Sequence, residues 1–360
     1  MRVRAVHQLL GALSVGDAIG NEAMVFRGFM RAQGYESEIF AGDIAPEMTG
    51  LGLSIAEFAR RPPAPDSLLI FHFSLGTPVA EVVLARPEPL ILRYHNVTPH
   101  RYFLGFSGHV VGLSYHGARR LASFARRASL GLAVSEFNRL DLQRAWFKET
   151  ATIPLSMNMA ALDTPPDRLV PLRYKDGRRN ILFVGRVAPN KKIEDLIRVF
   201  CAYQRYVEPL SRLLIVGEGR GFANYTRRLD EMVSHLRLDE VVFTGAVTQS
   251  ELNAYYQVAD AFVCLSEHEG YGAPLVEAMH FDLPVIAYDA GAVRETLQGG
   301  GILLKGKDPQ VVAELLGVLM NDATMRAAVL KTETEALARI RSVDIGVRLE
   351  AAVQSVGGAS

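Results

Sequence analysis

Two glutamates, Glu269 and Glu277, stand eight positions apart around a turn that contains Gly270, Gly272 and Pro274. An apolar run before the turn and an apolar segment after it predict a strand, a tight loop and a helix, with the proline in the first helical turn. The backbone N–H groups at the start of such a helix favour an anion, most often phosphate. Because carboxylates beside phosphate are unfavourable, we expect the glutamates to hold another part of the ligand, such as sugar hydroxyls.

A basic loop precedes this turn in the sequence. Gly185 allows a close turn, and Arg186, Lys191 and Lys192 follow it. Arginine offers a planar fork that matches phosphate, and lysine offers a mobile point charge. The loop therefore predicts a phosphate clamp, and a solvated basic loop is the alternative.

Several other loops carry weaker signals. Gly217 opens a glycine-rich stretch that lacks the G-x-G-x-x-G spacing of dinucleotide-binding loops. A tight turn is therefore at least as consistent with it as direct contact with a ligand. Val247 lies in a small apolar loop that either passes beneath a nucleobase or only turns the chain. Gly291 and Glu295 suit either a binding loop or a helix cap. Near the N-terminus, Gly16 opens a loop where the backbone can approach a ligand closely.

Two histidines, His72 and His95, each end a predicted strand. A histidine in that place is as consistent with a reacting centre as with a satisfied structural role. No metal-ligand spacing connects the first-half histidines, which are His72, His95, His100, His109 and His116. We therefore predict no metal site and no other cofactor.

Four arginines repeat at a spacing of seven residues, and they are Arg119, Arg120, Arg126 and Arg127. On a helix this spacing gathers them on one side. The side is either an ordinary solvated face or a docking surface for anionic lipid headgroups or an acceptor phosphate.

Strands alternate with helices twice along the chain, which predicts two α/β domains with doubly wound parallel sheets. Strands are expected at residues 3–9, 37–41, 68–73, 90–94, 132–134, 152–155, 181–185, 213–217, 241–244, 261–265, 284–288 and 302–304. Helices are expected at residues 22–33, 117–129, 194–206, 225–236, 249–258, 276–281, 309–320 and through the tail at 322–355. In such Rossmann-like folds ligands bind at the carboxyl ends of the strands.

The predicted domains are residues 1–165 and residues 179–340, with a turn-rich linker at 166–178. A helix in residues 341–360 is expected to pack back toward the first domain. The two domains are expected to face a central cleft.

The composition describes a globular chain of 360 residues with 49% hydrophobic and 22% charged residues. Its formal net charge of 0 argues against a nucleic-acid partner held by bulk charge. Cys201 and Cys264 are isolated in apolar contexts, so we expect buried thiols in a reducing compartment. No apolar run approaches the ~20 residues of a membrane span, and the N-terminus does not resemble a signal peptide. We expect a cytoplasmic protein, with peripheral contact at the inner membrane face if the arginine helix docks there.

The sequence resembles the family 4 retaining glycosyltransferases, which have the GT-B fold. The resemblance implies that residues 1–165 form the acceptor-side domain and residues 179–340 the nucleotide-sugar donor domain. That family carries an E-G-[FY]-G-x-x-x-x-E pattern, which residues 269–277 match. The order of the basic loop, the second glycine loop, the glutamate pair and the loop at Gly291 and Glu295 also agrees. Two departures are the lack of adjacent glycines after Gly16 and the presence of Asp282 where the family has glycine.

The resemblance implies roles for individual residues. Arg186 and Lys191, or Lys192 in its place, would hold the donor diphosphate, while Glu277 would bind the ribose hydroxyls. Glu269 would face the donor sugar, and His95 would lie near the reacting centre. The remaining donor contacts would come from Gly16, Gly217, Val247, Tyr271, Gly272, Ala273, Pro274 and Leu275.

The implied activity is retaining transfer of a hexose from a nucleotide-diphosphate sugar to a glycan or lipid-linked glycan. The segments around His95 and Glu269 resemble bacterial mannosyltransferases of polysaccharide assembly, which favours GDP-mannose ahead of a UDP-sugar. The positive charge of the basic loop and the helix start would stabilise the leaving group without a metal. The alternatives are an epimerase or phosphorylase on the same fold, or a non-catalytic relative that binds a sugar nucleotide.

Overall fold

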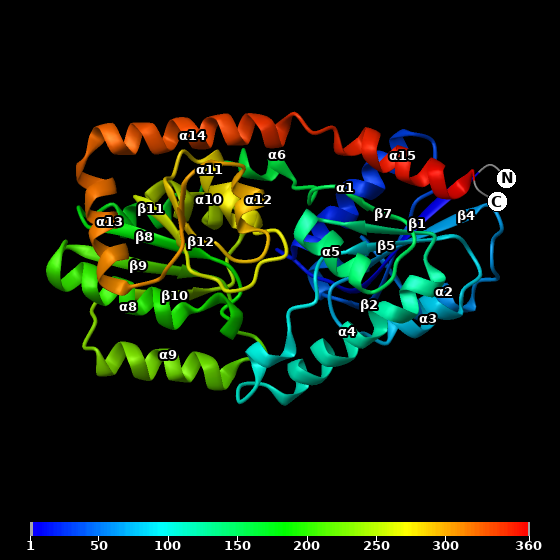
Figure 1. Cartoon of the computed structure of the whole chain (residues 1–360), viewed down its shortest axis with the longest axis horizontal. Coiled ribbons are helices and arrows are strands. Elements are labelled where there is room, and N and C mark those ends of the chain that lie inside the picture. The colour runs from blue at the N-terminus through cyan, green and yellow to red at the C-terminus, as the bar shows by residue number, and fades with distance from the viewer. Residues whose placement is uncertain (1–2, 359–360) are drawn as a thin grey trace. The chain divides into compact units, whose positions relative to one another are not determined.

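The computed structural model describes residues 3–358, and the chain forms two compact units (Figure 1). One unit contains the chain as far as Arg101, then His109–Asn158 and the C-terminal segment from Asp344. The other contains Tyr102–Gly108 and Met159–Val343. Within the described residues, no helix is both long enough and apolar enough to span a membrane.

The first unit is built on a parallel sheet of seven strands in the order β3-β2-β1-β4-β5-β6-β7. The strands are β1 Ala5–Leu13, β2 Ile39–Ile44, β3 Leu53–Ser54, β4 Ser67–Phe73, β5 Leu90–Tyr94, β6 Leu130–Ala133 and β7 Thr150–Thr152. Every residue of β4 and β5 is buried, as expected for central strands that are covered on both faces.

The helices of the first unit cover this sheet. They are α1 Ala18–Ala32, α2 Ile55–Arg60, α3 Val79–Ala85, α4 Gly108–Arg127, α5 Glu136–Arg144 and α15 Ile345–Gly357, with a short 3-10 turn at η1 Pro46–Met48. A second 3-10 turn, η2 His100–Phe103, begins in this unit and ends in the other. Asp17 caps α1, because its carboxylate accepts the N–H of Gly20 at 3.0 Å. On α15, Leu349 and Val353 are buried in one apolar cluster with Phe26 of α1. The last helix therefore completes the core of the first unit.

The second unit has a parallel sheet of six strands in the order β10-β9-β8-β11-β12-β13. The strands are β8 Arg179–Val184, β9 Ser211–Val216, β10 Val241–Gly245, β11 Ala261–Cys264, β12 Val285–Tyr288 and β13 Ile302–Leu304. The chain winds outward in one direction from β8 and in the other from β11. The gap between these two strands is the topological switch point, where α/β sheets bind their ligands.

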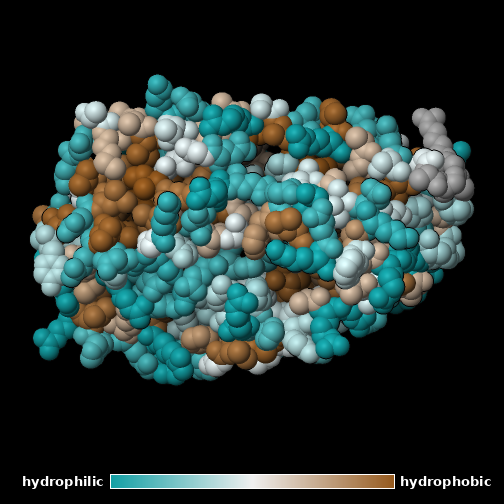
Figure 2. All heavy atoms as spheres, viewed as in Figure 1, coloured by the Kyte–Doolittle hydropathy of each residue, from teal (hydrophilic) through white to brown (hydrophobic). Residues whose placement is uncertain are grey.

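The helices of the second unit include a terminal pair, α13 Pro309–Asn321 and α14 Ala323–Arg341. The others are α6 Met159–Leu162, α7 Leu169–Tyr174, α8 Ile193–Tyr206, α9 Ala223–His235, α10 Gln249–Val258, α11 Ala273–His280 and α12 Val293–Leu297, with a 3-10 turn at η3 Pro189–Lys191. Figure 2 shows a largely polar surface with separate hydrophobic patches, one of them over α13, where Val311 and Val318 are exposed.

The strands and helices differ from the sequence prediction mainly at their ends. β1 runs on to Leu13, because Leu10 and Leu13 are buried beyond the predicted end at residue 9. β7 ends at Thr152 instead of continuing to residue 155. α4 begins at Gly108, nine residues before the predicted start of that helix at residue 117. The short strands and helices that were not predicted include β3, α2, α3, α5, α6, α7 and α12.

The stretch expected as a turn-rich linker contains the short helix α7. Asp167 begins it, since its carboxylate accepts the N–H groups of Leu169 and Val170 at 2.7 and 3.0 Å. Tyr174 is buried at its end, with its ring 5.7 Å from that of Tyr255 on α10. The helix forms because it packs on a distant element, which local sequence does not reveal.

Candidate functional site

The ends of β8 and β9 are held so close that their glycines are obligatory. Gly185 and Gly217 have φ values of 147° and 137°. A Cβ atom on Gly217 would lie 2.1 Å from the carbonyl oxygen of Gly185, which no side chain tolerates. The predicted close turns are therefore confirmed at both positions, and they bring the basic loop beside the second glycine loop.

The basic loop and the glutamate turn meet at the switch point. Lys191 Nζ lies 2.7 Å from both carboxylate oxygens of Glu269, which is buried. The backbone joins the same two loops, because Glu267 N–H donates to the carbonyl of Asn190 at 2.9 Å. The Asn190 side chain in turn donates to the carbonyl of His268 at 3.2 Å. The structure thus brings together two of the residues that the resemblance assigned to catalysis.

The neighbouring lysine, Lys192, contacts other carboxylates. Lys192 has a left-handed backbone (φ 54°) and begins α8. Its Nζ lies 3.4 Å from a carboxylate oxygen of Glu194 and 3.7 Å from one of Glu267. Of the two lysines that the sequence left open, Lys191 is therefore the one beside Glu269.

Arg186 lies over the second glycine loop. Its guanidinium carbon is 4.9 Å from the centroid of the Phe222 ring, and Nη2 donates to the carbonyl of Arg220 at 2.8 Å. A cation above an aromatic face is held there by the electrostatic attraction of the ring. The predicted phosphate-binding arginine is thus positioned at the end of β8.

The start of α11 has the predicted geometry. Gly272 is the N-cap residue, with φ 92°, and Pro274 lies in the first turn. Ala273 and Pro274 are half-buried. Leu275 behaves differently, because its side chain is buried in the core and its N–H donates to the carbonyl of Gly272 at 3.0 Å. Leu275 therefore shapes the turn from the inside, and its contact with a donor stays a prediction.

Glu277 lies on α11 and is held by a residue that the sequence reasoning missed. The hydroxyl of Tyr256, on α10, donates to Glu277 Oε2 at 2.7 Å. Burial raises the pKa of Glu277, and the hydrogen bond from Tyr256 lowers it in part. Within the described residues Oε1 of Glu277 has no hydrogen-bond partner, so one oxygen is held and the other is left to accept. A tyrosine two residues before the end of a predicted helix carries no local signal of this role.

Lys307 is a second residue that the sequence reasoning missed. Its Nζ lies 2.7 Å from Asp195 Oδ2 and 2.8 Å from Glu267 Oε1. Burial opposes its charge, but these two hydrogen bonds outweigh that effect and raise the pKa of Lys307. It lies three residues after the end of β13, so the rule that sites gather at the carboxyl ends of strands could have identified it.

The loop after β12 holds the backbone of Glu269. Gly291 has φ 61°, and a Cβ atom there would lie 2.4 Å from the Glu269 carbonyl oxygen. That carbonyl accepts the N–H of Ala292 at 2.9 Å. Tyr271 is buried, and its carbonyl accepts the hydroxyl of Thr296 at 2.5 Å. Val247 is half-buried in the loop after β10.

In the first unit His95 follows β5, and its N–H donates to the carbonyl of Phe73 at 2.9 Å. Its Nε2 is 3.0 Å from Nδ1 of His72. Burial, followed by the neighbouring His95, lowers the pKa of His72 to about 3. Burial, followed by Arg93, lowers that of His95 well below the usual range. Both imidazoles are therefore neutral near pH 7. Gly16 lies exposed in the loop between β1 and α1, with φ 73°.

His72, His95 and Glu22 place one ligand atom each within 4.8 Å of one another, a grouping able to hold a metal ion. The sequence spacing of these three residues gave no sign of it. Both carboxylate oxygens of Glu22 are already paired with the Arg93 guanidinium, at 2.7 and 2.9 Å. A divalent ion there would lie beside a fixed positive charge, so a metal-free site stays our prediction.

The four arginines of α4 do not form one free face. Arg120 pairs with Glu81, and Arg127 Nε donates to the carbonyl of Arg86 at 3.0 Å. Arg119 donates to the hydroxyl of Tyr115 at 3.0 Å and is exposed, as is Arg126. Two of the four therefore tie the helix to its own unit.

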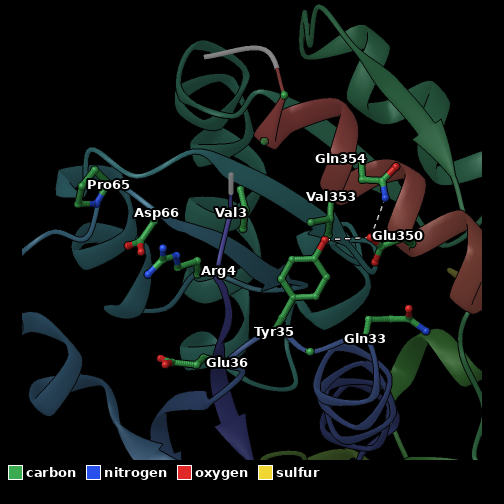
Figure 3. Close-up of a pocket in the computed structure, with 13 residues that line it drawn as sticks. Val3, Arg4, Gln33, Tyr35, Glu36, Pro65, Asp66, Glu350, Val353 and Gln354 are labelled. Carbon is green, nitrogen blue, oxygen red and sulfur yellow. Dashed lines mark hydrogen bonds between the residues drawn. The ribbon is translucent and has the colours of Figure 1, made fainter. Parts of the chain in front are cut away.

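A polar pocket lies at the opposite end of the first sheet (Figure 3). Arg4 and Asp66 immediately precede β1 and β4, so the pocket is at the amino ends of those strands. Tyr35 donates to Glu350 across it, at 2.9 Å. The pocket is therefore separate from the strand ends that carry the candidate site residues.

Comparison with known proteins places these features in a family context. Residues 170–335 match the model of the family described as glycosyl transferases group 1. A GDP-mannose-dependent alpha-(1-6)-phosphatidylinositol monomannoside mannosyltransferase of Mycolicibacterium smegmatis is 29% identical over 238 residues, which cover 61% of each chain. A D-inositol 3-phosphate glycosyltransferase of Salinispora arenicola is 33% identical over 41% of this chain and 34% of the relative. The matches thus span about a third to three fifths of these relatives.

Solved structures match over nearly the whole chain. Sucrose-phosphate synthase from Thermosynechococcus elongatus gives a TM-score of 0.75 at 18% identity, covering 99% of this chain and 100% of that one. Anabaena Alr3699/HepE in complex with UDP and glucose gives 0.73 at 19% identity, covering 98% and 100%. The predicted fold of two Rossmann-like domains is confirmed. Residues 170–335 thus match the glycosyl transferases group 1 family, and the chain has the GT-B fold of these solved structures.

Proposed function

We propose that this protein is a retaining glycosyltransferase that moves a hexose from a nucleotide-diphosphate sugar to a glycan or lipid-linked glycan. The observation that carries the proposal is the pairing of Lys191 with Glu269 at the β8/β11 switch point, beside Arg186. A cationic group and a carboxylate in one place match a ligand that is anionic at one end and hydroxylated at the other.

The positive groups serve the leaving diphosphate. Negative charge builds on that group as the bond to the sugar breaks, and cations held in place beforehand stabilise it. Arg186 is already held over Phe222, so it needs little rearrangement to meet a phosphate. Lys191 exchanges part of its contact with Glu269 for the diphosphate when the donor binds.

The carboxylates serve hydroxyl groups. Glu269 accepts hydrogen bonds from the transferred sugar, and Glu277 offers its unpaired Oε1 to the ribose hydroxyls. Tyr256 keeps the other oxygen of Glu277 in place, so the carboxylate does not have to be ordered again when the donor arrives. This division of labour uses no metal and no other cofactor.

GDP-mannose is the favoured donor and a UDP-sugar the next choice. The names of the mycobacterial relatives specify GDP-mannose, which supports the first, and the Anabaena structure holds UDP and glucose, which keeps the second open. The acceptor is proposed only as a class of molecule, namely a glycan or a lipid-linked glycan.

Donor binding is testable without the acceptor. We expect GDP-mannose to raise the melting temperature of the full chain, with a half-maximal effect at micromolar concentration, because binding only to the folded state stabilises it. UDP-glucose and mannose alone serve as comparisons. If neither nucleotide sugar shifts the melting temperature, the proposal fails. If the donor is converted to an isomer with no acceptor present, the protein is instead an epimerase.

The place of action is proposed as the cytoplasm, with peripheral contact to an anionic membrane surface through α4. The exposed Arg119 and Arg126 support that contact, since cations on an exposed helix attract anionic headgroups. A nucleic-acid partner is not proposed, because the formal net charge is 0.

A further inference from the structure

Lys307 connects the edge strand of the second sheet to both loops of the candidate donor site. It lies three residues after β13, the last strand in the order β8-β11-β12-β13. Its Nζ is 2.7 Å from Asp195 Oδ2, in the first turn of α8, and 2.8 Å from Glu267 Oε1, two residues before Glu269. The same Nζ is 4.9 Å from the centroid of the Tyr288 ring at the end of β12. One ammonium group therefore links segments that follow different strands of one unit.

The backbone around Lys307 is held at two points. Asp308 begins α13, because its carboxylate accepts two N–H groups of the first turn at 3.0 and 3.1 Å. The end of β13 is bonded to the loop after β12, since the carbonyl of Leu304 accepts the N–H of Asp289 at 3.0 Å. The lysine side chain is 14% exposed, so its ion pairs are screened less by salt than those of a surface lysine.

The two carboxylates that Lys307 contacts belong to different loops of the candidate donor site. Asp195 N–H donates to the carbonyl of Lys192 at 3.0 Å, which joins this acid to the basic loop. Glu267 belongs to the glutamate turn, and its N–H donates to the carbonyl of Asn190 at 2.9 Å. Both carboxylates lie within 2.8 Å of one nitrogen, so without the ammonium their like charges would repel. The lysine thus replaces a repulsion between the two loops by an attraction.

A second cation, Lys192, also faces Glu267. Its Nζ lies 3.7 Å from Glu267 Oε2 and 3.4 Å from Glu194 Oε1. At 3.7 Å the two groups form an ion pair without a hydrogen bond, whereas Lys307 approaches Glu267 to 2.8 Å. We therefore expect Lys307 to hold the Glu267 side chain more strongly than Lys192 does.

We propose that Lys307 is a positioning residue for the donor diphosphate. It holds the glutamate turn against the basic loop and so keeps Lys191 and Glu269 in the arrangement that receives the donor. Cations held in place beforehand bind an anion without the free-energy cost of ordering them. The part that concerns the diphosphate rests on the proposed function, whereas the holding of the two loops does not.

The first experiment is hydrogen exchange of the full chain without ligand, measured by mass spectrometry. The peptides of interest cover the two loops, at residues 186–196 and 262–272. In Lys307→Met we expect exchange in these peptides to be about 10-fold faster, because the hydrogen bond between Glu267 N–H and the Asn190 carbonyl opens more often. Lys307→Arg keeps the charge and bonds to both carboxylates, so it should show exchange close to that of the parent.

The control for this experiment is Lys305→Met, which removes an exposed lysine from the same loop and should leave exchange unchanged. Unchanged exchange in Lys307→Met would overturn the proposal. Faster exchange throughout the second unit would also overturn it, because Lys307 would then support the fold in general and not the two loops.

The second experiment measures the affinity for GDP by calorimetry, with UDP as the alternative nucleotide. Lys307→Met should bind about 10-fold more weakly than the parent, the equivalent of one charged hydrogen bond, while Lys307→Arg should keep most of the affinity. In a Glu267→Gln background the same Lys307→Met substitution should weaken binding by only about 3-fold, since one of the two repelling charges is already absent. Equal losses in the two backgrounds would show that Lys307 does not act through Glu267.

The two experiments separate failure of this proposal from failure of the proposed function. If the loops of Lys307→Met exchange faster but its affinity for the nucleotide equals that of the parent, the positioning role is wrong. If the parent chain binds neither GDP nor UDP, the proposed function fails, and hydrogen exchange still decides whether Lys307 holds the two loops together.

Discussion

Lys191 is the residue on which the candidate donor site depends most. It is the cation in direct contact with the Glu269 carboxylate, and the chain folds so that Lys192 points to other acids. The two lysines are adjacent and chemically identical, so their different roles arise only from backbone geometry. The left-handed conformation of Lys192 separates them.

Replacing Lys191 by methionine tests whether this lysine stabilises the leaving diphosphate. The variant keeps the length of the side chain but leaves the leaving diphosphate without one of its cations, so turnover of the preferred nucleotide sugar should fall by about 10²–10³-fold. Transfer or donor hydrolysis, measured as nucleotide release, is the assay. Lys175→Met removes an exposed lysine outside the site and should leave the rate unchanged. A Lys191 variant with near-parent turnover would remove this residue from the leaving-group role.

At the scale of secondary-structure elements, the four arginines of α4 fall into two groups. Arg120 and Arg127 attach it to Glu81 and to the backbone around Arg86, whereas Arg119 and Arg126 are exposed. Removing all four arginines would confuse folding with docking. The test of membrane contact therefore concerns only the exposed pair.

The double variant Arg119→Ser/Arg126→Ser should bind anionic phosphatidylserine vesicles more weakly than the parent chain. Each cation near such a surface contributes about 1 kcal/mol, so the expected loss is about 30-fold. Sedimentation with vesicles at low salt measures it. The control Arg60→Ser/Lys331→Ser removes two other exposed charges and should have little effect. Equal binding by all three proteins would return α4 to the role of a solvated helix.

At the scale of the whole molecule, one buried acid links stability to pH. Glu333 on α14 is 1% exposed, and its Oε1 accepts the N–H of Val285 at 2.7 Å. Its Oε2 has no partner within the described residues. Burial raises the pKa of Glu333 to about 8, although the Val285 hydrogen bond opposes the rise. The folded chain thus keeps a proton that the unfolded chain releases.

The raised pKa of Glu333 makes the folded chain less stable as the pH rises. The stabilising contribution of the protonated acid is complete below the unfolded pKa of about 4.3 and is lost as pH rises through about 8. We expect the melting temperature of the parent chain to fall across this window, and that of Glu333→Gln to fall less, because glutamine does not ionise. Glu335→Gln, at an exposed site on the same helix, is the control. Parallel profiles for the parent and Glu333→Gln would contradict the assignment.

Most of the strands, turns and helices that form the candidate site could be predicted from residues close together in the sequence. The strand, turn and helix around Gly272 follow from an apolar run, two glycines and a proline, since turn chemistry and side-chain period act within a few residues. The same rules located the basic loop and the glutamate pair. They missed α7, which depends on packing between Tyr174 and Tyr255.

The tertiary structure decided which of those residues meet. The sheet order places β8 beside β11, and only then does Lys191, and not Lys192, reach Glu269. The same holds for the buried hydrogen bonds that join Gln8, His72 and His95, because β1, β4 and β5 must lie side by side before these bonds can form. Local sequence determines what each strand and loop is, whereas contacts between distant loops depend on the order in which the strands pair.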